Sequence, residues 1–370
     1  MKGMTMQRYL LQLFGFLLAV GLLVSQTACS NQESKTAQLV QTVNLGKPPM
    51  AVAWRPDGKQ FAAVGFGNLG VWDATTGKQV ATPAMWALES SLAYSPDGRL
   101  LVLHKAVKDH QGTSALVWLD AKDQHVISEY FDEYPTLIDG TAFSPDSRLL
   151  VVGAGKKTGG VATVFDVAEK KPIAQLVAAI PDGRGGEHIE RIIFSPDGSM
   201  VIAGCISGAV NVWATKDWQL IKTFKAHKGY VLSMAFSPDG KWLATGSSSS
   251  GKTAWRYNPD TKIKTETTYD DPIKIWDTTT WEQVKALPIH DKYTSSLAFL
   301  PDGKHLVSAN EDRILFWDIQ TEKQVGIIKG KFKLGGGLNF ALSQDGQYLA
   351  VGGIGTLEAQ VWKIVSQLSN

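Results

Sequence analysis

The sequence has 370 residues, of which 44% are hydrophobic and 19% charged, and its formal net charge at pH 7 is +2. A chain so near neutrality has no long-range field that would attract nucleic acid, which argues against a nucleic-acid-binding protein. It contains two cysteines, Cys29 and Cys205.

The first predicted element is an export signal. Lys2 and Arg8 precede the apolar run LLQLFGFLLAVGLLV (residues 10–24), and SQTAC follows it. The run is shorter than the roughly 20 residues that span a bilayer, so it indicates a signal peptide rather than a permanent membrane helix. The segment resembles a bacterial lipoprotein signal, although Gln26 stands where that motif usually has Leu. The resemblance implies cleavage after Ala28 and a lipid on Cys29; the alternative is ordinary cleavage and a soluble exported protein.

Cleavage after Ala28 would remove two basic residues and no acidic ones, leaving 35 of each sign, so the mature chain is formally neutral. With Cys29 lipidated, Cys205 has no cysteine to pair with. We therefore expect no intrachain disulfide, and the packing of the core must hold the fold.

A four-residue turn motif recurs seven times along the rest of the chain. Its copies are RPDG at 55, SPDG at 95, SPDS at 144, SPDG at 195 and 237, LPDG at 300 and SQDG at 343. Pro fixes φ, Asp hydrogen-bonds to the following backbone, and Gly adopts positive φ. Because short apolar runs flank each copy, the motif predicts a tight turn between antiparallel strands, and we interpret its aspartates as turn residues rather than catalytic acids.

A third strand in each repeat ends in a large aromatic residue, and an apolar residue eight positions later marks a fourth strand. The aromatics are Trp72, Trp118, Phe165, Trp213, Trp276, Trp317 and Trp362. The fourth strands are marked by Val80, Val126, Ile173, Ile221, Val284 and Val325. Asp follows the Trp directly in three repeats. We expect these aromatics to pack in the core.

Four strands per unit, seven units and the Trp-Asp pairs resemble the WD-repeat β-propellers. The resemblance implies an all-β fold, a seven-bladed propeller with four antiparallel strands in each blade. The last repeat lacks a fourth strand before the chain end, whereas LVQTV at 39–43 has no preceding three. We therefore predict that the N-terminal strand completes the last blade, as in WD-repeat propellers, and removes an open sheet edge.

Length variation is confined to the connections that share the face called the top in propellers. The span from the turn proline to the third-strand aromatic is 38 residues from Pro238 to Trp276, against 16 from Pro56 to Trp72. The fifth repeat thus carries an insertion, residues 248–268 and the acidic stretch that follows. It begins with GSSSSGKT (residues 246–253), which fits the phosphate-binding loop pattern. That chemistry needs a helix after the loop. We expect a Ser-rich, Pro-containing loop instead, and predict neither nucleotide binding nor a cofactor.

The insertion also carries residue types that anchor protein interfaces. The candidates for partner binding are Lys252, Trp255, Arg256 and Tyr257. A passive insertion is the alternative, because lengthening a surface loop costs only about 0.6 kcal/mol per doubling. Further lysines and arginines in other top connections indicate a locally basic face, or simply solvated side chains.

The resemblance also implies a buried polar network in each complete repeat, from a His before strand one to a Ser or Thr in strand two, an Asp and the Trp. The matching residues are His227, Thr245, Asp270 and Trp276 in the fifth repeat, and His290, Ser308 and Trp317 in the sixth, with Glu311 or Asp312 as the acid. We interpret these residues as structural, and Cys205 as a buried small side chain.

An enzymatic alternative rests on Glu89, Asp139 and Glu190, which lie six or seven residues before three successive turn prolines. Some propellers, such as lactonases, hold a metal at the channel mouth, and these carboxylates could converge on a hard cation such as Ca²⁺. We favour no catalytic or metal role for them.

The sequence therefore predicts a signal peptide (residues 1–28), a lipidated tether (29–38) and a propeller (39–366). We expect a non-catalytic scaffold that binds a protein partner through its top loops. The N-terminal lipid would hold it in a bacterial membrane; Ser30 after the cysteine resembles sorting to the outer membrane, facing the periplasm.

Overall fold

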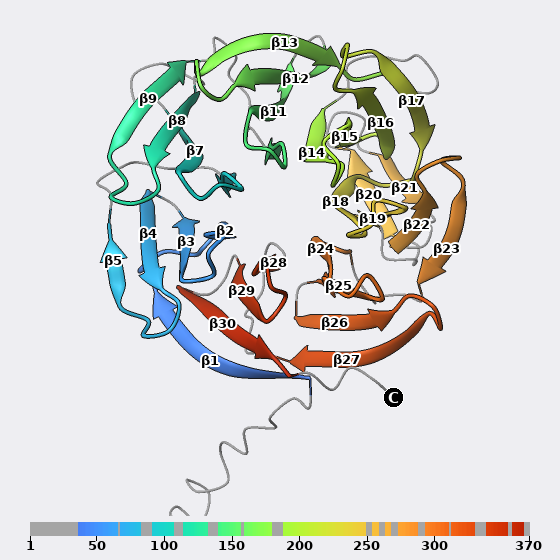
Figure 1. Cartoon of the computed structure of the whole chain (residues 1–370). Coiled ribbons are helices and arrows are strands. Elements are labelled where there is room, and N and C mark those ends of the chain that lie inside the picture. The colour runs from blue at the N-terminus through green and yellow to red at the C-terminus, as the bar shows by residue number, and fades with distance from the viewer. Residues whose placement is uncertain are drawn as a thin grey trace, which may run out of the picture. The chain divides into compact units, whose positions relative to one another are not determined.

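The apolar runs on either side of each Pro-Asp turn form antiparallel strands, and seven four-stranded sheets are arranged as the blades of a ring (Figure 1). The structure is a computed structural model. It describes residues 36–65, 67–82, 91–106, 114–131, 140–156, 159–179, 188–248, 254–258, 263–267, 273–287, 293–310, 312–329, 338–353 and 357–365. Within these ranges, no helix has the length and apolar character needed to cross a membrane. The predicted seven-bladed propeller is confirmed.

The blades follow one another in chain order, each with its first strand innermost. Blade 1 comprises β2 (Ala51–Trp54), β3 (Gln60–Gly65), β4 (Asn68–Asp73) and β5 (Gln79–Ala81). Blade 2 comprises β6 (Leu92–Tyr94), β7 (Leu100–Ala106), β8 (Ser114–Asp120) and β9 (Val126–Phe131). Blade 3 comprises β10 (Gly140–Phe143), β11 (Leu149–Lys156), β12 (Gly159–Asp166) and β13 (Lys171–Val177). Blade 4 comprises β14 (Ile189–Phe194), β15 (Met200–Cys205), β16 (Ala209–Ala214) and β17 (Leu220–Lys225).

The last three blades include the two departures from a simple repeat. Blade 5 comprises β18 (Val231–Phe236), β19 (Trp242–Ser247), β22 (Ile273–Asp277) and β23 (Gln283–Leu287). Blade 6 comprises β24 (Ser296–Phe299), β25 (His305–Ala309), β26 (Arg313–Asp318) and β27 (Lys323–Lys329). Blade 7 comprises β28 (Leu338–Leu342), β29 (Tyr348–Gly353), β30 (Glu358–Ile364) and, as its outermost strand, β1 (Ala37–Asn44).

The ring closes as the repeat arithmetic predicted, because β1 pairs antiparallel with β30. The strand begins at Ala37, two residues earlier than expected, and Ala37 is opposite Ile364. On the channel side, the Asn339 side chain of blade 7 donates to the Met50 carbonyl next to blade 1 at 2.6 Å. The first and last blades are therefore joined at both the outer rim and the channel.

The recurring turns line the bottom face and contact one another around the ring. Six of the seven end in a glycine with positive φ, Gly58 at +68° among them, and blade 3 has Ser147 at +63° instead. A Cβ added to Gly346 would lie 2.3 Å from Cδ of Pro301 in the preceding turn. Ser147 adds a contact of its own, since its Oγ accepts a hydrogen bond from the Asp97 backbone at 3.0 Å. Positive φ is therefore the shared requirement of these turns, and space is an additional one at Gly346.

The turn aspartates are held by hydrogen bonds, as their interpretation as turn residues requires. In blade 4, Asp197 accepts from the Ser195 hydroxyl at 2.6 Å and from the Ser199 backbone at 3.0 Å. These bonds to the charged form hold the pKa of the Asp197 carboxyl below its ordinary value. The same hydroxyl accepts from the Met200 backbone at 2.9 Å, so Ser195 ties the turn to its second strand.

Seven hydrophobic clusters fill the seams between neighbouring blades, and in every blade except blade 2 the predicted third-strand aromatic packs toward the preceding blade. Trp276 of blade 5, for example, packs with Ile202 and Val212 of blade 4. The seven predicted aromatics are all buried, at 0–8% exposed. The core therefore consists of seven similar seams rather than one centre.

Blade 2 departs from the predicted alignment by one residue. Leu119 pairs with Leu101 and packs against blade 1, in the place that Trp72 has opposite Phe61. Trp118 therefore faces the other way, into the seam with blade 3, where its ring centroid lies 6.3 Å from those of both Phe143 and Phe165. The sequence reasoning paired the wrong residue because Trp118 is the more obvious aromatic.

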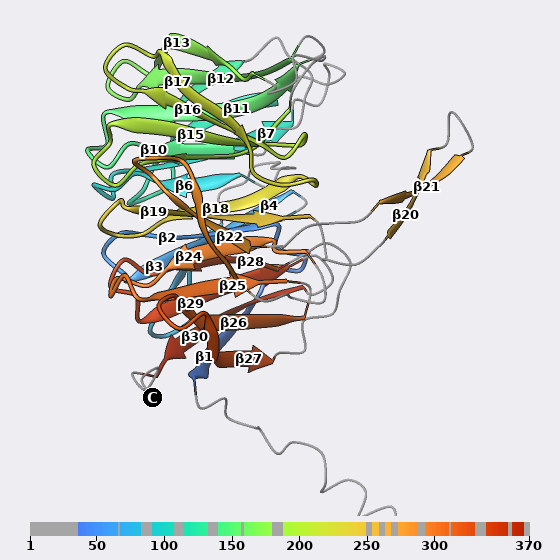
Figure 2. The same ribbon diagram turned by 90° about the vertical axis from the view of Figure 1, so that its right-hand side faces the viewer.

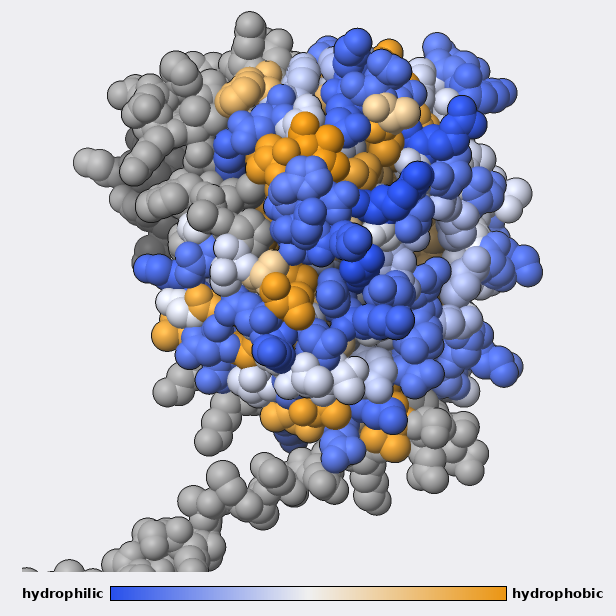
Figure 3. All heavy atoms as spheres, turned by 60° about the vertical axis from the view of Figure 1, so that its left-hand side comes forward, coloured by the Kyte–Doolittle hydropathy of each residue, from blue (hydrophilic) through white to orange (hydrophobic). Residues whose placement is uncertain are grey.

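A β-bulge interrupts the register between the third and fourth strand of every blade, just beyond the third-strand core position. The extra residue is apolar each time: Val80, Ile127, Ile173, Ile221, Val284, Val325 and, on β1, Val40. Ile127, not the predicted Val126, holds this place in blade 2. Most of these residues are exposed on the outer rim, and Figure 3 shows separate apolar patches among polar side chains on one side of it.

Candidate interaction face

The insertion in blade 5 forms a β-hairpin rather than the irregular loop that the sequence reasoning expected. β20 (Ala254–Asn258) and β21 (Ile263–Thr267) pair antiparallel with each other, and no blade strand adds to their sheet (Figure 2). The signal was present in the sequence: the β-favouring runs AWRYN and IKTET flank PDTK, a turn composition. Blade 5 thus presents an additional structural element between its second and third strands.

The hairpin also bears on the phosphate-binding pattern at 246–253. Gly246 and Ser247 are the last residues of β19, and residues 249–253 lie outside the described ranges. The element that follows the pattern is the strand β20, where phosphate binding through this motif needs the N-terminus of a helix. The absence of nucleotide binding stays a prediction. It was based on the expectation that no helix follows this loop, and a strand, β20, follows it.

The start of the insertion is fixed to the loop that enters blade 5. The Tyr230 backbone donates to the Ser248 hydroxyl at 2.8 Å, and the Ser248 backbone donates back to the Tyr230 carbonyl at 3.0 Å. One residue earlier, the Ser247 carbonyl accepts from the Thr294 backbone at 2.9 Å, next to the first strand of blade 6. The insertion therefore leaves the propeller from a defined point between two blades.

Three of the four candidate partner-binding residues lie in the hairpin. Trp255, Arg256 and Tyr257 are the central residues of β20, paired with Glu266, Thr265 and Lys264 of β21. Lys252 lies outside the described residues. The hairpin consequently gathers three of the residue types most used at protein interfaces on a single short strand.

A buried polar cluster lies in blade 5, the blade that carries this insertion. Thr245 Oγ1 is 2.7 Å from His227 Nε2 and accepts a hydrogen bond from Trp276 Nε1 at 2.9 Å. All three residues are at most 6% exposed. The structure thus brings together three of the four predicted network residues, while Asp270 lies outside the described residues.

Blade 6 has a shorter version of the same cluster. The Trp317 indole donates to the Ser308 hydroxyl at 2.8 Å, whereas His290 and Glu311 lie outside the described residues. Asp312, the other candidate acid, pairs with Arg313 at 2.9 Å in the connection before β26. The Trp-to-hydroxyl bond is therefore the described part of the network that the two blades share.

The remaining predicted sites are separate. Cys205 is completely buried in β15, and the Asn211 amide contacts its sulfur at 3.5 Å. Of the three carboxylates in the metal alternative, Glu190 is half-buried in β14, and Glu89 and Asp139 lie outside the described residues. The adjacent Arg191 donates through Nε to the Leu232 carbonyl at 2.8 Å, which links blades 4 and 5.

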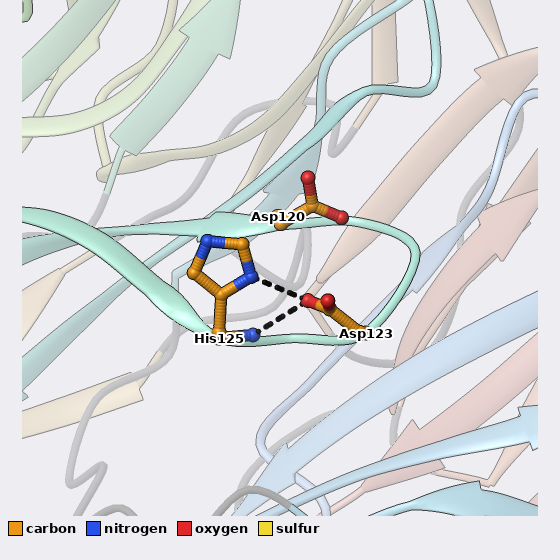
Figure 4. Close-up of side chains that lie close together, drawn as sticks. All are labelled: Asp120, Asp123 and His125. Carbon is orange, nitrogen blue, oxygen red and sulfur yellow. Dashed lines mark hydrogen bonds and ion pairs between the residues drawn. The ribbon is translucent and has the colours of Figure 1, made fainter.

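One cluster that sequence reasoning missed lies in the bottom turn between β8 and β9. Asp120, Asp123 and His125 place ligand-type atoms within 4.8 Å of one another (Figure 4). Asp123 Oδ1 is 2.6 Å from His125 Nδ1, a hydrogen bond that raises the pKa of His125 and lowers that of Asp123. Gln124 at φ +61° brings the two side chains together, so local spacing alone did not reveal them. Asp123 and His125 are exposed and Asp120 is half-buried, and the hydrogen bonds within the turn account for the arrangement.

Comparison with known sequences gives the same class of protein as the fold. The WD40 profile, described as WD domain, G-beta repeat, matches residues 182–214, 218–254 and 281–318. These segments fall in blades 4 to 6, where the repeat signature is best preserved. The chain thus contains WD40 repeats and folds as a seven-bladed β-propeller, in agreement with the resemblance seen in the sequence.

The curated relatives are longer proteins than this chain. The chain is 33% identical over 152 residues to a "Periodic tryptophan protein 2 homolog" from Schizosaccharomyces pombe, covering 40% of this chain and 15% of that protein. It is 28% identical over 144 residues to "Protein hir1" from Aspergillus terreus, covering 32% and 14%. "WD repeat and SOCS box-containing protein 1" from Mus musculus is 26% identical over 256 residues, covering 57% and 56%. The chain thus spans only a minor part of the first two relatives, and all three are eukaryotic.

Proposed function

We propose that this chain is a non-catalytic scaffold, held by a lipid on Cys29 in the bacterial envelope, that binds a protein partner through its top face. The observation that carries this proposal is the β20–β21 hairpin, an element added to one blade of an otherwise regular ring. Its start is fixed by the hydrogen bonds between Tyr230 and Ser248, in a blade whose interior holds a buried polar cluster. A rigid base lowers the entropy lost when such a hairpin binds a partner.

The position of β1 supports the proposed arrangement of tether and hairpin. Ala37 lies opposite Ile364, whose backbone donates to the Gln347 carbonyl in a bottom turn. The chain therefore enters the propeller at the bottom face, whereas the hairpin arises from a top connection. A lipid tether would leave the top face open to partners, in the outer membrane facing the periplasm if Ser30 directs sorting there.

Paired variants test the scaffold against the metal-hydrolase alternative. We expect Trp255→Ala with Arg256→Ala to reduce capture of the partner from intact cells, and Glu190→Gln to leave it unchanged. Both proteins should retain the unfolding temperature of the parent chain, which serves as the control for folding. Turnover by purified protein that a chelator abolishes, and that Glu190→Gln also abolishes, would contradict the scaffold proposal.

A further inference from the structure

The point where the tether joins the propeller is fixed rather than loose. Thr36, the first described residue, is 6% exposed, and its carbonyl accepts from the Val365 backbone at 2.9 Å. Its hydroxyl accepts from the Ile327 backbone of blade 6 at 3.3 Å. A Cβ on Gly326 would lie 2.4 Å from the Thr36 methyl carbon, so this glycine makes room for Thr36. The tether therefore starts at one defined place on the outer rim, between blades 6 and 7.

Exposed apolar side chains surround that place. Leu39 and Val40 on β1 are 43% and 50% exposed, and Val365, which is hydrogen-bonded to Thr36, is 41% exposed. The exposed Lys363 is opposite Gln38 in the same pair of strands. Apolar residues beside a lysine are the composition that favours the boundary between lipid headgroups and acyl chains.

The charge of the bottom face also varies around the ring. In blades 6, 7 and 1, next to the tether, the bottom turns and strand ends carry equal numbers of basic and acidic residues: Arg55, Lys59, Lys78, Lys304, Lys323 and Lys363 against Asp57, Asp73, Asp302, Asp318, Glu322 and Asp345. In blades 4 and 5 they carry Lys216 and Lys241 against Asp197, Asp217, Asp239, Asp277 and Glu282, a net charge of −3. An anionic lipid surface would thus repel the opposite side of the ring and not the side near the tether.

We propose that the rim formed by Leu39, Val40, Lys363 and Val365 contacts the lipid surface and tilts the propeller toward it. This inference rests on the proposed lipid anchor at Cys29. From Cys29 to Thr36 is seven residues, about 25 Å at full extension, and the attachment is on the outermost strand of its blade. The rim of blade 7 is therefore held near the membrane, while the tether places no such limit on blade 4.

Blade 4 provides a matched control. Leu220, opposite Trp213, and the bulge residue Ile221 occupy the same strand-four positions as Leu39, opposite Trp362, and Val40. They are 42% and 51% exposed, nearly the same as Leu39 and Val40. The two sites thus share local structure and exposure, and they differ in distance from the tether and in the charge around them.

The experiment places an environment-sensitive fluorophore on Leu39→Cys or on Leu220→Cys in the lipidated protein, in vesicles of phosphatidylethanolamine and phosphatidylglycerol. Cys205 is completely buried, so the introduced thiol takes the label. Flotation with the vesicles, compared with Cys29→Ser, reports the anchor independently of the fluorophore. We expect emission from position 39 to move to shorter wavelength and to be quenched by nitroxide-labelled lipid, with neither effect at position 220. Lys363→Glu should reduce both effects at position 39.

Three results would overturn the inference. Equal, water-like emission from both positions while the protein floats with the vesicles would show an anchored propeller whose rim stays away from lipid. A shift at position 39 that grows with protein concentration in detergent, without vesicles, would assign the rim to a second copy of the chain. Failure of the lipidated protein to float, or flotation of Cys29→Ser to the same extent, would contradict the anchor itself and the contact that depends on it.

Discussion

The bottom turns and the top connections of this propeller come from the same seven repeats, yet they differ in almost every physical respect. At the bottom, the turns share one backbone conformation with a positive φ at the same position, and most of them contact the preceding turn, as Gly346 does at Pro301. At the top, the connections differ in length, and one contains the β20–β21 hairpin. The bottom turns contact one another and hold the ring together, so they tolerate little change. The top connections do not have this structural role, and one of them can therefore carry a binding element.

The largest expected loss of stability comes from removing a large buried side chain between two blades. Trp118→Ala removes a fully buried indole that contacts Phe143 and Phe165, and we expect a loss of about 3–5 kcal/mol in the free energy of unfolding. Urea denaturation followed by circular dichroism measures it. Val126→Ala, at an exposed position of the same blade, should change the value by less than about 0.5 kcal/mol. Equal effects of the two substitutions would contradict the register assigned to blade 2.

The polar cluster in blade 5 offers a second test, because blade 6 has a shorter version of it for comparison. Thr245→Val removes the partner of both His227 Nε2 and Trp276 Nε1, and we expect a cost of about 3 kcal/mol. Ser308→Ala in blade 6 removes the acceptor of Trp317 Nε1, and should cost about 1–2 kcal/mol. Thermal unfolding of the two variants measures the difference. A smaller effect for Thr245→Val than for Ser308→Ala would contradict the claim that the Thr245 hydroxyl serves two buried partners.

Acid should weaken the bottom turns before it affects the rest of the ring. Hydrogen bonds from Ser144, Ser195 and Ser237 lower the pKa values of Asp146, Asp197 and Asp239. Their contribution to stability is therefore complete above the unfolded-state pKa of about 3.9, and is lost as pH falls through the lower folded-state values. We expect the unfolding temperature to fall as pH drops below about 4, and less steeply in Asp197→Asn. If the unfolding temperature of Asp197→Asn falls with pH as steeply as that of the parent chain, the acid sensitivity does not arise from this turn.

The hairpin should matter least for stability. Replacing residues 249–272 by a short Gly-Ser link keeps the pairing of Gly246 with Ile273 and shortens one connection. We expect the free energy of unfolding to change by less than about 1 kcal/mol, because loop length has a weak effect on folding entropy. Calorimetry gives the value. A much larger loss would show that the hairpin is part of the propeller core and not a separate binding element.

The repeats made most of this fold predictable from the sequence. Seven turn motifs gave the number of blades, and the unpaired fourth strand gave the closure of β1 on β30, because both follow from spacing alone. The register of blade 2 was missed, since Trp118 and Leu119 are both apolar and only the pairing with Leu101 decides between them. The hairpin was missed because Ser, Gly and Pro in the insertion outweighed its two short β-favouring runs. The candidate partner residues were found from composition, which names residue types but no partner.

The most direct test of the account is photo-crosslinking in intact cells from two positions of blade 5. One is Trp255 in the hairpin, and the other is Thr279, which is exposed in the bottom turn of the same blade. We expect a discrete protein adduct from position 255 and none from position 279. The adduct from position 255 should be lost when the same protein also carries Arg256→Ala and Tyr257→Ala. An adduct from position 279 with none from position 255 would contradict the claim that the inserted hairpin is the working surface of this propeller.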